Sequence, residues 1–239
     1  MPGVKGNQNG IIKRKTPAVG EASSRRLIAA QEEERKRLAR ELHDGVGQTL
    51  LVIKNRTFLA SQAPNLPGAV AEQLNEISTI AMRAIEEVRE ISYALRPFQL
   101  DWMGLTKAIQ GLIAKVSLAG GFRVVADVDS IDGPFLPEAE INFYRIVQES
   151  LTNIVKHARA AVVEVRIKTV DRHLALSIKD DGCGFDLSCL PENPASGGLG
   201  LIGISERARI LGGQLAIHSQ PGQGTHLSIT IPLPTAHEK

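Results

Sequence analysis

A histidine followed by an aspartate, with a glutamine four residues after the aspartate, is the pattern with the most definite chemistry in this chain. His43, Asp44 and Gln48 lie where apolar residues are spaced by three and four, which predicts an amphipathic helix. A histidine beside a carboxylate can lend its Nδ1 proton to Asp44 and present its other ring nitrogen as a nucleophile. Gln48 lies one turn beyond Asp44 on the same side. The alternative is a solvated polar helix face.

A second polar group is predicted on one face of a helix over residues 137–157. Glu149, Asn153 and either Lys156 or His157 recur there at helical spacing. A carboxylate, an amide oxygen and a cation in a line suit a hydrated magnesium ion and the phosphates that it bridges. On its own this pattern is also typical of an exposed helix face.

Two short turns carry glycines next to polar side chains. Glycines after a strand let the backbone approach a ligand closely, and Asp180 can accept a hydrogen bond from an exocyclic amine such as adenine N6. A turn between the last two strands adds a threonine hydroxyl that can reach the nucleotide. Purely structural turns are the alternative. The predicted contact residues are Asp180, Gly182, Gly184, Gly222, Gly224 and Thr225.

A third glycine cluster, Gly198, Gly200 and Gly203, forms a literal G-x-G-x-x-G before a predicted helix. A dinucleotide fingerprint requires a buried strand just upstream, whereas residues 190–196 contain two prolines, so we exclude that interpretation. We expect the backbone amides of this loop and the following helix N-terminus to hold phosphate oxygens. The proline-bearing residues before it are expected to act as a movable lid.

Composition excludes several classes of function. The formal charge is +2 with both signs interspersed, which gives no electrostatic case for direct nucleic-acid binding. The two cysteines are too few for a disulfide framework and lack zinc-site spacing, which favours a reducing cytoplasm. No apolar run is long enough to cross a bilayer, so we expect a soluble cytoplasmic chain without a membrane segment.

The pattern divides the chain into a flexible leader (1–22), a helical hairpin (23–96), an α+β domain (97–235) and a tail (236–239). The second hairpin helix has apolar residues in unbroken alternation of four and three between Val70 and Leu95, as in the seam of a helical bundle. Two chains would bury this seam by pairing their hairpins, so we predict a homodimeric four-helix bundle. The alternative is that the seam packs on the C-terminal half of its own chain.

Beyond Pro97 helices and strands are mixed around one sheet, which predicts an α+β two-layer sandwich with its strand pairs as antiparallel hairpins. Helices are expected over residues 105–116, 137–157 and 199–211, and strands over residues 122–128, 163–169, 174–179, 215–218 and 226–231.

Taken in order, these motifs resemble those of bacterial two-component sensor histidine kinases of the nitrate-sensor and DesK-like class over residues 33–232. Residues 41–44 with Gln48 match the phosphoacceptor motif, and residues 95–105 look like the junction between the dimerisation bundle and the ATP domain. The C-terminal half is similar to the Bergerat (GHKL) ATP-binding fold shared with gyrase, the Hsp90 chaperone and MutL. Its N box, two glycine boxes and terminal Gly-x-Gly-Thr fall on residues 149–157, 180–184, 198–203 and 222–225.

The resemblance implies ATP and Mg²⁺ as ligands, with Asn153 on the metal and Asp180 on adenine. It implies autophosphorylation of His43, transfer to an aspartate of a response regulator with a helix-turn-helix output domain, and removal of phosphate from that regulator through Asp44 and Gln48. Asp181 departs from the family, which often has asparagine there. A serine kinase of the anti-sigma type or plain ATPase would not need the His43–Asp44 pair, and intact ATP motifs argue against a non-catalytic scaffold.

Overall fold

The computed structural model describes residues 21–133, 135–186 and 199–233 of the chain. The predicted leader up to residue 20, the predicted lid at 190–196 and the predicted tail lie outside the described residues. The chain divides into two compact units, residues 22–98 and the described residues from 99 onward.

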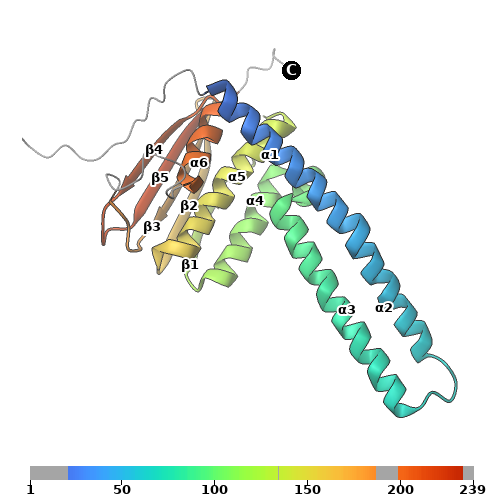
Figure 1. The fold of residues 1–239 in the computed structure, drawn as a ribbon. Coiled ribbons are helices and arrows are strands. Elements are labelled where there is room, and N and C mark those ends of the chain that lie inside the picture. Colours follow the sequence, from blue (N-terminus) through green and yellow to red (C-terminus); the bar gives the residue numbers. More distant parts are fainter. Residues whose placement is uncertain (1–20, 134, 187–198, 234–239) are drawn as a thin grey trace, which may run out of the picture. The chain divides into compact units, whose positions relative to one another are not determined.

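The first unit is a helical hairpin (Figure 1). Its elements are α1 (Glu21–Glu41), a π-helical turn η2 (Leu42–Gly47), α2 (Gln48–Ser61) and α3 (Gly68–Leu95). Helix α3 runs back beside α2 after the connection at residues 62–67. It ends where predicted, because Arg96 is extended (φ −146°) as expected for a residue before proline.

This hairpin buries little of its apolar surface against itself. No residue of α2 is buried, and in α3 only Ala81 and Ser92 are. Residues of the predicted seam such as Ile77 and Ile91 are 44% and 51% exposed. Large apolar side chains are also exposed along α2, namely Leu51, Val52, Ile53, Phe58 and Leu59. The hairpin therefore leaves much of its apolar surface for contact with something else.

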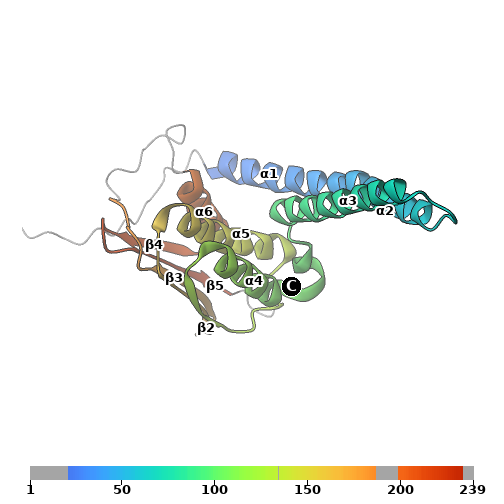
Figure 2. The same cartoon turned by 90° about the horizontal axis from the view of Figure 1, so that it is seen from below.

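The second unit is the predicted two-layer sandwich, with three helices on one face of a five-stranded sheet (Figures 1 and 2). Its helices are α4 (Phe98–Gly120), α5 (Pro137–Asn153) with the π-helical turn η3 (Ile154–Ala158), and α6 (Leu199–Ile210). Its strands are β1 (Arg123–Val128), β2 (Val162–Val170), β3 (His173–Asp180), β4 (Gln214–Ser219) and β5 (Thr225–Pro232).

The sheet has the order β1-β2-β3-β5-β4 and is mixed. The predicted antiparallel hairpins β2–β3 and β4–β5 are present. The prediction that all strand pairs are hairpins is wrong for β1, which pairs parallel to β2. The reason is that α5 lies between these two strands and returns the chain to the end of the sheet from which β1 started.

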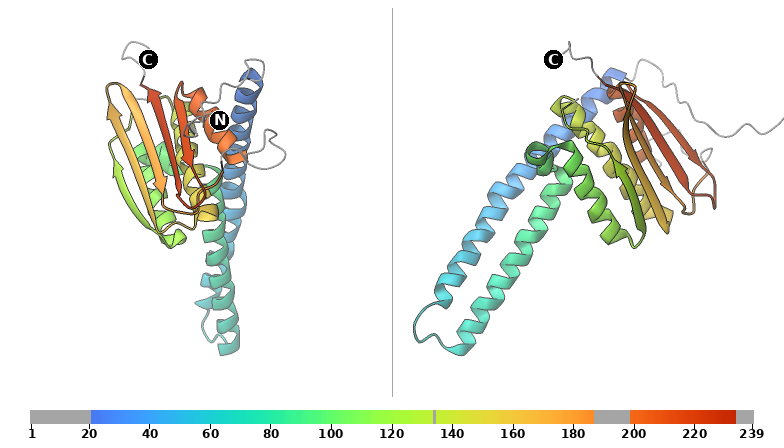
Figure 3. Two further views of the ribbon diagram at one scale, coloured as in Figure 1. Left: turned by 90° about the vertical axis from the view of Figure 1, so that its left-hand side faces the viewer. Right: turned by 180° about the vertical axis from the view of Figure 1, so that it is seen from behind.

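Side chains point alternately to the two sides of each strand, so the sheet has a core face and an open face. The inward residues of β2, β3 and β5 are buried against α4, α5 and α6, as the alternating burial pattern of each strand shows. Within the described part of the unit no helix covers the outward face, which is visible in Figure 3. The largest fully buried side chains are Phe143, Leu105, Ile109, Ile131, Ile146, Leu151, Ile167, Leu174, Leu176, Ile204, Ile229 and Ile231.

Helix α4 is kinked at a glycine near its start, and the residues beside this kink contact the segment that follows β1. Gly104 has φ 82° and ψ 169°, a conformation that is essentially restricted to glycine. Two hydrogen bonds hold the next turn of the helix. The Thr106 N–H donates to Asp132 Oδ1 at 3.0 Å, and the Ile131 N–H donates to the Thr106 hydroxyl oxygen at 2.9 Å. A Cβ on Gly104 would lie 2.5 Å from Asp132 Oδ1, so this contact requires glycine.

We therefore expect Gly104→Ala to destabilise the second unit by about 1–3 kcal/mol, from backbone strain and displacement of Asp132. Gly111→Ala is the matched control on the same helix, because a Cβ there meets nothing within 4 Å. It should be neutral or stabilising by up to about 1 kcal/mol. Urea unfolding followed by circular dichroism measures both changes, and equal stability of the two variants would contradict the constraint at Gly104.

Candidate functional site

A cavity of about 590 Å³ lies in the second unit among α5, η3, α6, β3 and β5. This volume is within the range of pockets that bind small molecules. Its lining residues are Glu149, Ser150, Asn153, Ile154, Lys156, His157, Ala158, Ile178, Asp180, Cys183, Gly184, Phe185, Asp186, Gly200, Leu201, Ile204, Thr225 and Leu227.

Most of the predicted ligand-binding residues meet in this cavity. Those that line it are Glu149, Asn153, Lys156, His157, Asp180, Gly184, Gly200 and Thr225. Gly182, Gly203, Gly222 and Gly224 do not line it. Gly198 lies outside the described residues.

The cavity has a polar side and an apolar side. The polar side comes from the end of α5 and from η3, where Lys156 and His157 are exposed and follow directly after Asn153. The apolar side includes Ile178 and Leu227, which sequence reasoning missed. Both are inward residues of alternating strands, so strand periodicity was the signal that could have found them. This division suits a ligand with a flat apolar part and an anionic part.

Asp180 is a buried carboxylate at the end of β3, with only 4% of its surface exposed. Burial raises the pKa of Asp180, although hydrogen bonds from the backbone N–H groups of Gly182 and Thr225 oppose this shift. The Gly182 N–H donates to Asp180 Oδ1 at 2.9 Å. The carboxylate is thus held in one orientation at the cavity wall, where it can accept a hydrogen bond from a ligand.

Asp181 has the opposite environment although it is the next residue. Its exposed carboxylate accepts hydrogen bonds from the N–H groups of Ala161 and Val162 at 2.8 and 2.9 Å, where β2 begins. These bonds, with Val162 first, hold the pKa of Asp181 below its ordinary value. The residue that departs from the family pattern is therefore tied to the sheet and is absent from the cavity lining.

Three glycines act as spacers where chain segments cross next to the cavity. A Cβ on Gly182 would collide with the carbonyl of Ala158, one on Gly184 with the carbonyl of Gln220, and one on Gly224 with the carbonyl of Asp180. The close approach is fixed by backbone hydrogen bonds from Cys183 N–H to the Ala158 carbonyl at 2.7 Å and from Gly222 N–H to the Cys183 carbonyl at 2.6 Å. Gly182 and Gly224 thus have a structural reason to be glycine.

Gly200 brings the first turn of α6 directly against α5. A Cβ at this position would collide with Glu149 Oε1 and would lie 3.3 Å from Asn153 Nδ2. Gly200 therefore lets the amino-terminal end of α6, whose first amide groups have no partner within the helix, reach the polar side of the cavity.

The His43 group lies in the other unit, on the π-helical turn η2, which sequence reasoning did not foresee. His43, Asp44 and Gln48 are exposed. The Gly45 carbonyl accepts both the Gln48 N–H and the Thr49 hydroxyl, the latter at 2.8 Å. His43 and Asp44 lie within the π-helical turn, and Gln48 follows directly after it as the first residue of α2. All three side chains are thus presented on one short exposed segment.

Two kinds of feature are absent from the described residues. Among the described residues no group of three or more His, Cys, Asp and Glu side chains is arranged to hold a metal ion. None of the helices in the described ranges is long and apolar enough to span a membrane.

Comparison with protein families gives two matches. Residues 34–100 match the family described as histidine kinase, and residues 138–235 match the histidine kinase-, DNA gyrase B- and HSP90-like ATPase family. The first match contains the His43 turn, and the second contains every residue that lines the cavity.

Two curated relatives and one solved structure agree with these matches. An uncharacterized sensor-like histidine kinase of Chloroflexus aurantiacus is 36% identical, and the oxygen sensor histidine kinase NreB of Staphylococcus carnosus is 33% identical. Each match covers 87% of this chain, which spans 36% and 59% of the respective relatives. The histidine kinase domain of an Erythrobacter litoralis blue-light-activated kinase shares the fold, with TM-score 0.51, 22% identity, and coverage of 82% of this chain and 94% of that one.

The two adjacent carboxylates predict opposite effects of substitution by asparagine. Asp180→Asn should keep or raise the stability of the folded protein at pH 7, because the buried charge of Asp180 costs free energy at pH values above its raised pKa. As the pH falls through that pKa, Asp180 becomes neutral and the wild type gains stability relative to the variant. The affinity of the variant for adenine nucleotide should fall roughly ten- to a hundredfold. Calorimetric titration and thermal unfolding at several pH values measure both effects.

Asp181→Asn is the matched control. It should retain nucleotide affinity but lose stability at neutral pH, since the pKa of Asp181 is lowered and its contribution is present only above that pKa. If both variants bound nucleotide as the wild type does, Asp180 would have no role in recognition.

Proposed function

Because this chain belongs to the sensor histidine kinases, we propose that it is the catalytic core of a protein-histidine kinase that phosphorylates His43 with ATP. The observation that carries the proposal is the separation of two parts in one chain. An exposed histidine–aspartate pair lies on a helical hairpin, and a nucleotide-sized cavity lies in an ATPase-type domain.

The residues of the cavity fit ATP with Mg²⁺. The Asp180 carboxylate accepts a hydrogen bond from the adenine amine, and Ile178 and Leu227 contact the adenine ring. Lys156 and the first turn of α6 face the phosphates. Asn153 supplies an amide oxygen to Mg²⁺, which commonly takes one or two protein ligands beside phosphates and water. The bound Mg²⁺ would offset negative charge on the phosphates.

The phosphoryl transfer forms a bond between a ring nitrogen of His43 and the γ-phosphorus and breaks the bond from that phosphorus to the β–γ bridging oxygen of ATP, which leaves as ADP. Asp44 is the hydrogen-bond partner or base that accepts the proton of the other ring nitrogen. Both side chains are exposed, so a domain carrying ATP can reach them.

We further infer that the hairpin forms a homodimer. Ile77 and Ile91 remain exposed in this chain, although they lie in the apolar repeat of α3. A second copy offers the same surface and closes a four-helix bundle about a twofold axis. Pairing thus removes apolar area that a single chain leaves in water.

The phosphoryl group then passes from His43 to an aspartate of a response regulator with a helix-turn-helix output domain. We expect this step to take place in the cytoplasm. The charge of +2 with interspersed signs agrees with DNA contact by the regulator alone.

The proposal is tested by His43→Gln, which removes the nucleophile. We expect loss of acid-labile, base-stable phosphate from γ-labelled ATP and no change in nucleotide affinity, because His43 belongs to the other unit and does not line the cavity. His173→Gln, at an exposed histidine of β3, is the control and should label as the wild type does. Labelling of the His43 variant at the wild-type level would reject His43 as the phosphoacceptor.

Gln48 supports the reverse activity, in which the same segment removes phosphate from the regulator. A side-chain amide can donate to and accept from water, so Gln48 can aim a water at the acyl phosphate of a docked receiver without ionising. Its exposed position directly after the turn that carries His43 allows a docked protein to meet both residues.

Gln48→Ala should therefore retain autophosphorylation and phosphotransfer but slow the loss of phosphate from the regulator several-fold. Gln73→Ala, at an exposed glutamine of α3, is the matched control. The decay of isolated phosphorylated regulator is followed after addition of each kinase. Equal decay with the Gln48 variant and the wild type would show that this amide has no part in dephosphorylation.

A further inference from the structure

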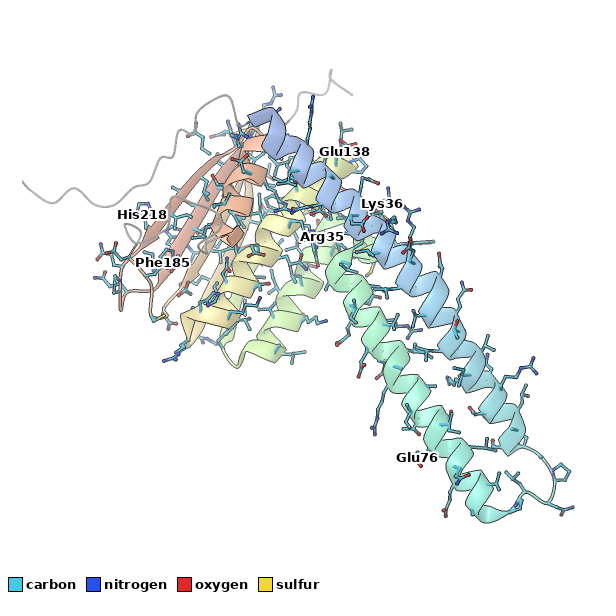
Figure 4. The ribbon with its side chains drawn as sticks, viewed as in Figure 1. Arg35, Lys36, Glu76, Glu138, Phe185 and His218 are labelled. Carbon is cyan, nitrogen blue, oxygen red and sulfur yellow. The ribbon has the colours of Figure 1, made fainter. Side chains whose placement is uncertain are left out.

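Two histidines face each other on the open side of the sheet, away from the cavity. His218 of β4 and His226 of β5 are directly paired in the antiparallel ladder, and their ring centroids are 6.3 Å apart with an interplanar angle of 27°. Both belong to the outward set of their strands, since their neighbours Ile217 and Leu227 are buried. Figure 4 labels His218 on this part of the sheet. The kinase chemistry proposed above uses neither ring.

A hydrogen bond orients the inner ring of the pair. Ser177 Oγ of β3 lies 2.9 Å from His226 Nε2. When Nε2 carries the proton and donates to this hydroxyl oxygen, the lone pair is on Nδ1, which is then available to a ligand. Metal-bound histidines are commonly fixed in this way, with the second ring nitrogen donating to a neighbouring acceptor.

The distance between the rings fits a single bridging ion. A nitrogen–metal bond of about 2.0–2.1 Å places the centroid of a coordinating imidazole roughly 3 Å from the metal. Rings whose centroids are 6.3 Å apart are close enough to share one ion once a nitrogen of each ring points to it. His218 is exposed, and χ2 of histidine is a broad torsion, so its ring can turn toward the common point.

Charged groups around the histidine pair include some that favour metal binding and some that oppose it. Burial first, then His218, Lys179 and Arg166, lower the pKa of His226, while Glu164 opposes the shift. The lowered pKa favours the neutral form of the His226 ring, which is the form that binds metal. The positive charges of Lys179 and Arg166 disfavour a nearby cation, and the ion pair of Arg166 with Glu164 at 2.8 Å offsets part of that effect.

We propose that His218 and His226 form a two-ligand surface site for a divalent transition metal ion of the zinc, nickel or copper type, with water in the remaining positions. Imidazole nitrogen is a preferred ligand of these ions, whereas Mg²⁺ prefers oxygen. The bound ion would link β4 to β5 on the reverse side of the strand that carries Thr225 and Leu227 to the cavity.

The site is tested by calorimetric titration of the untagged full chain with Zn²⁺, in parallel with the single variants His218→Gln and His226→Gln. His173→Gln is the matched control, because it removes an outward histidine of the same sheet that lies at the far end of β3. We expect the wild type and this control to bind one more Zn²⁺ per chain than either variant of the pair. Mg²⁺ should not replace Zn²⁺ at this site.

Equal Zn²⁺ stoichiometry in the wild type and both variants of the pair would overturn the proposal. So would loss of the same equivalent in His173→Gln.

Discussion

The cavity of the second unit depends on the close crossing of three backbone segments, at Ala158, at residues 180–184 and at residues 220–224. Side chains at Gly182, Gly184 or Gly224 would occupy space already taken by carbonyl oxygens of a neighbouring segment. The crossing brings the turn η3, the end of β3 and the β4–β5 turn to one place. Asp180, Thr225 and the exposed cations of η3 can line a common space because of it. The constraint is one of backbone distance, and it acts before any ligand is bound.

Each strand near this crossing serves two surfaces through simple alternation. On β3, Asp180 points to the cavity, whereas the preceding Lys179 belongs to the open face. On β5, Thr225 and Leu227 line the cavity on either side of His226, which faces outward. A change on one surface therefore lies only one peptide unit from the other. The two faces differ in their contacts but share the same hydrogen-bonded ladder.

Periodicity and glycine spacing predict most of the fold, including the helical hairpin and the element order of the sandwich. They do not give the parallel pairing of β1 with β2, because a pattern within a strand carries no information on its partner. From the sequence, Gly182 and Gly224 are predicted to contact a ligand. In the structure, contacts between segments remote in sequence require glycine at these positions. The apolar walls from Ile178 and Leu227 were missed since they look like ordinary core positions. The roles of the site residues themselves remain predictions.

The π-helical turn at His43 has a geometric consequence for the hairpin. An α-helix advances about 100° per residue, and a turn closed from i to i+5 accommodates one residue more than a turn closed from i to i+4. The side chains of α1 and α2 are therefore out of phase by one residue across Leu42–Gly47, relative to an uninterrupted α-helix. A change to i+4 hydrogen bonding at this turn would rotate α1 about its own axis relative to α2 by about 100°, while the helix stayed continuous. The phosphoacceptor candidate lies on the segment where that rotation would take place.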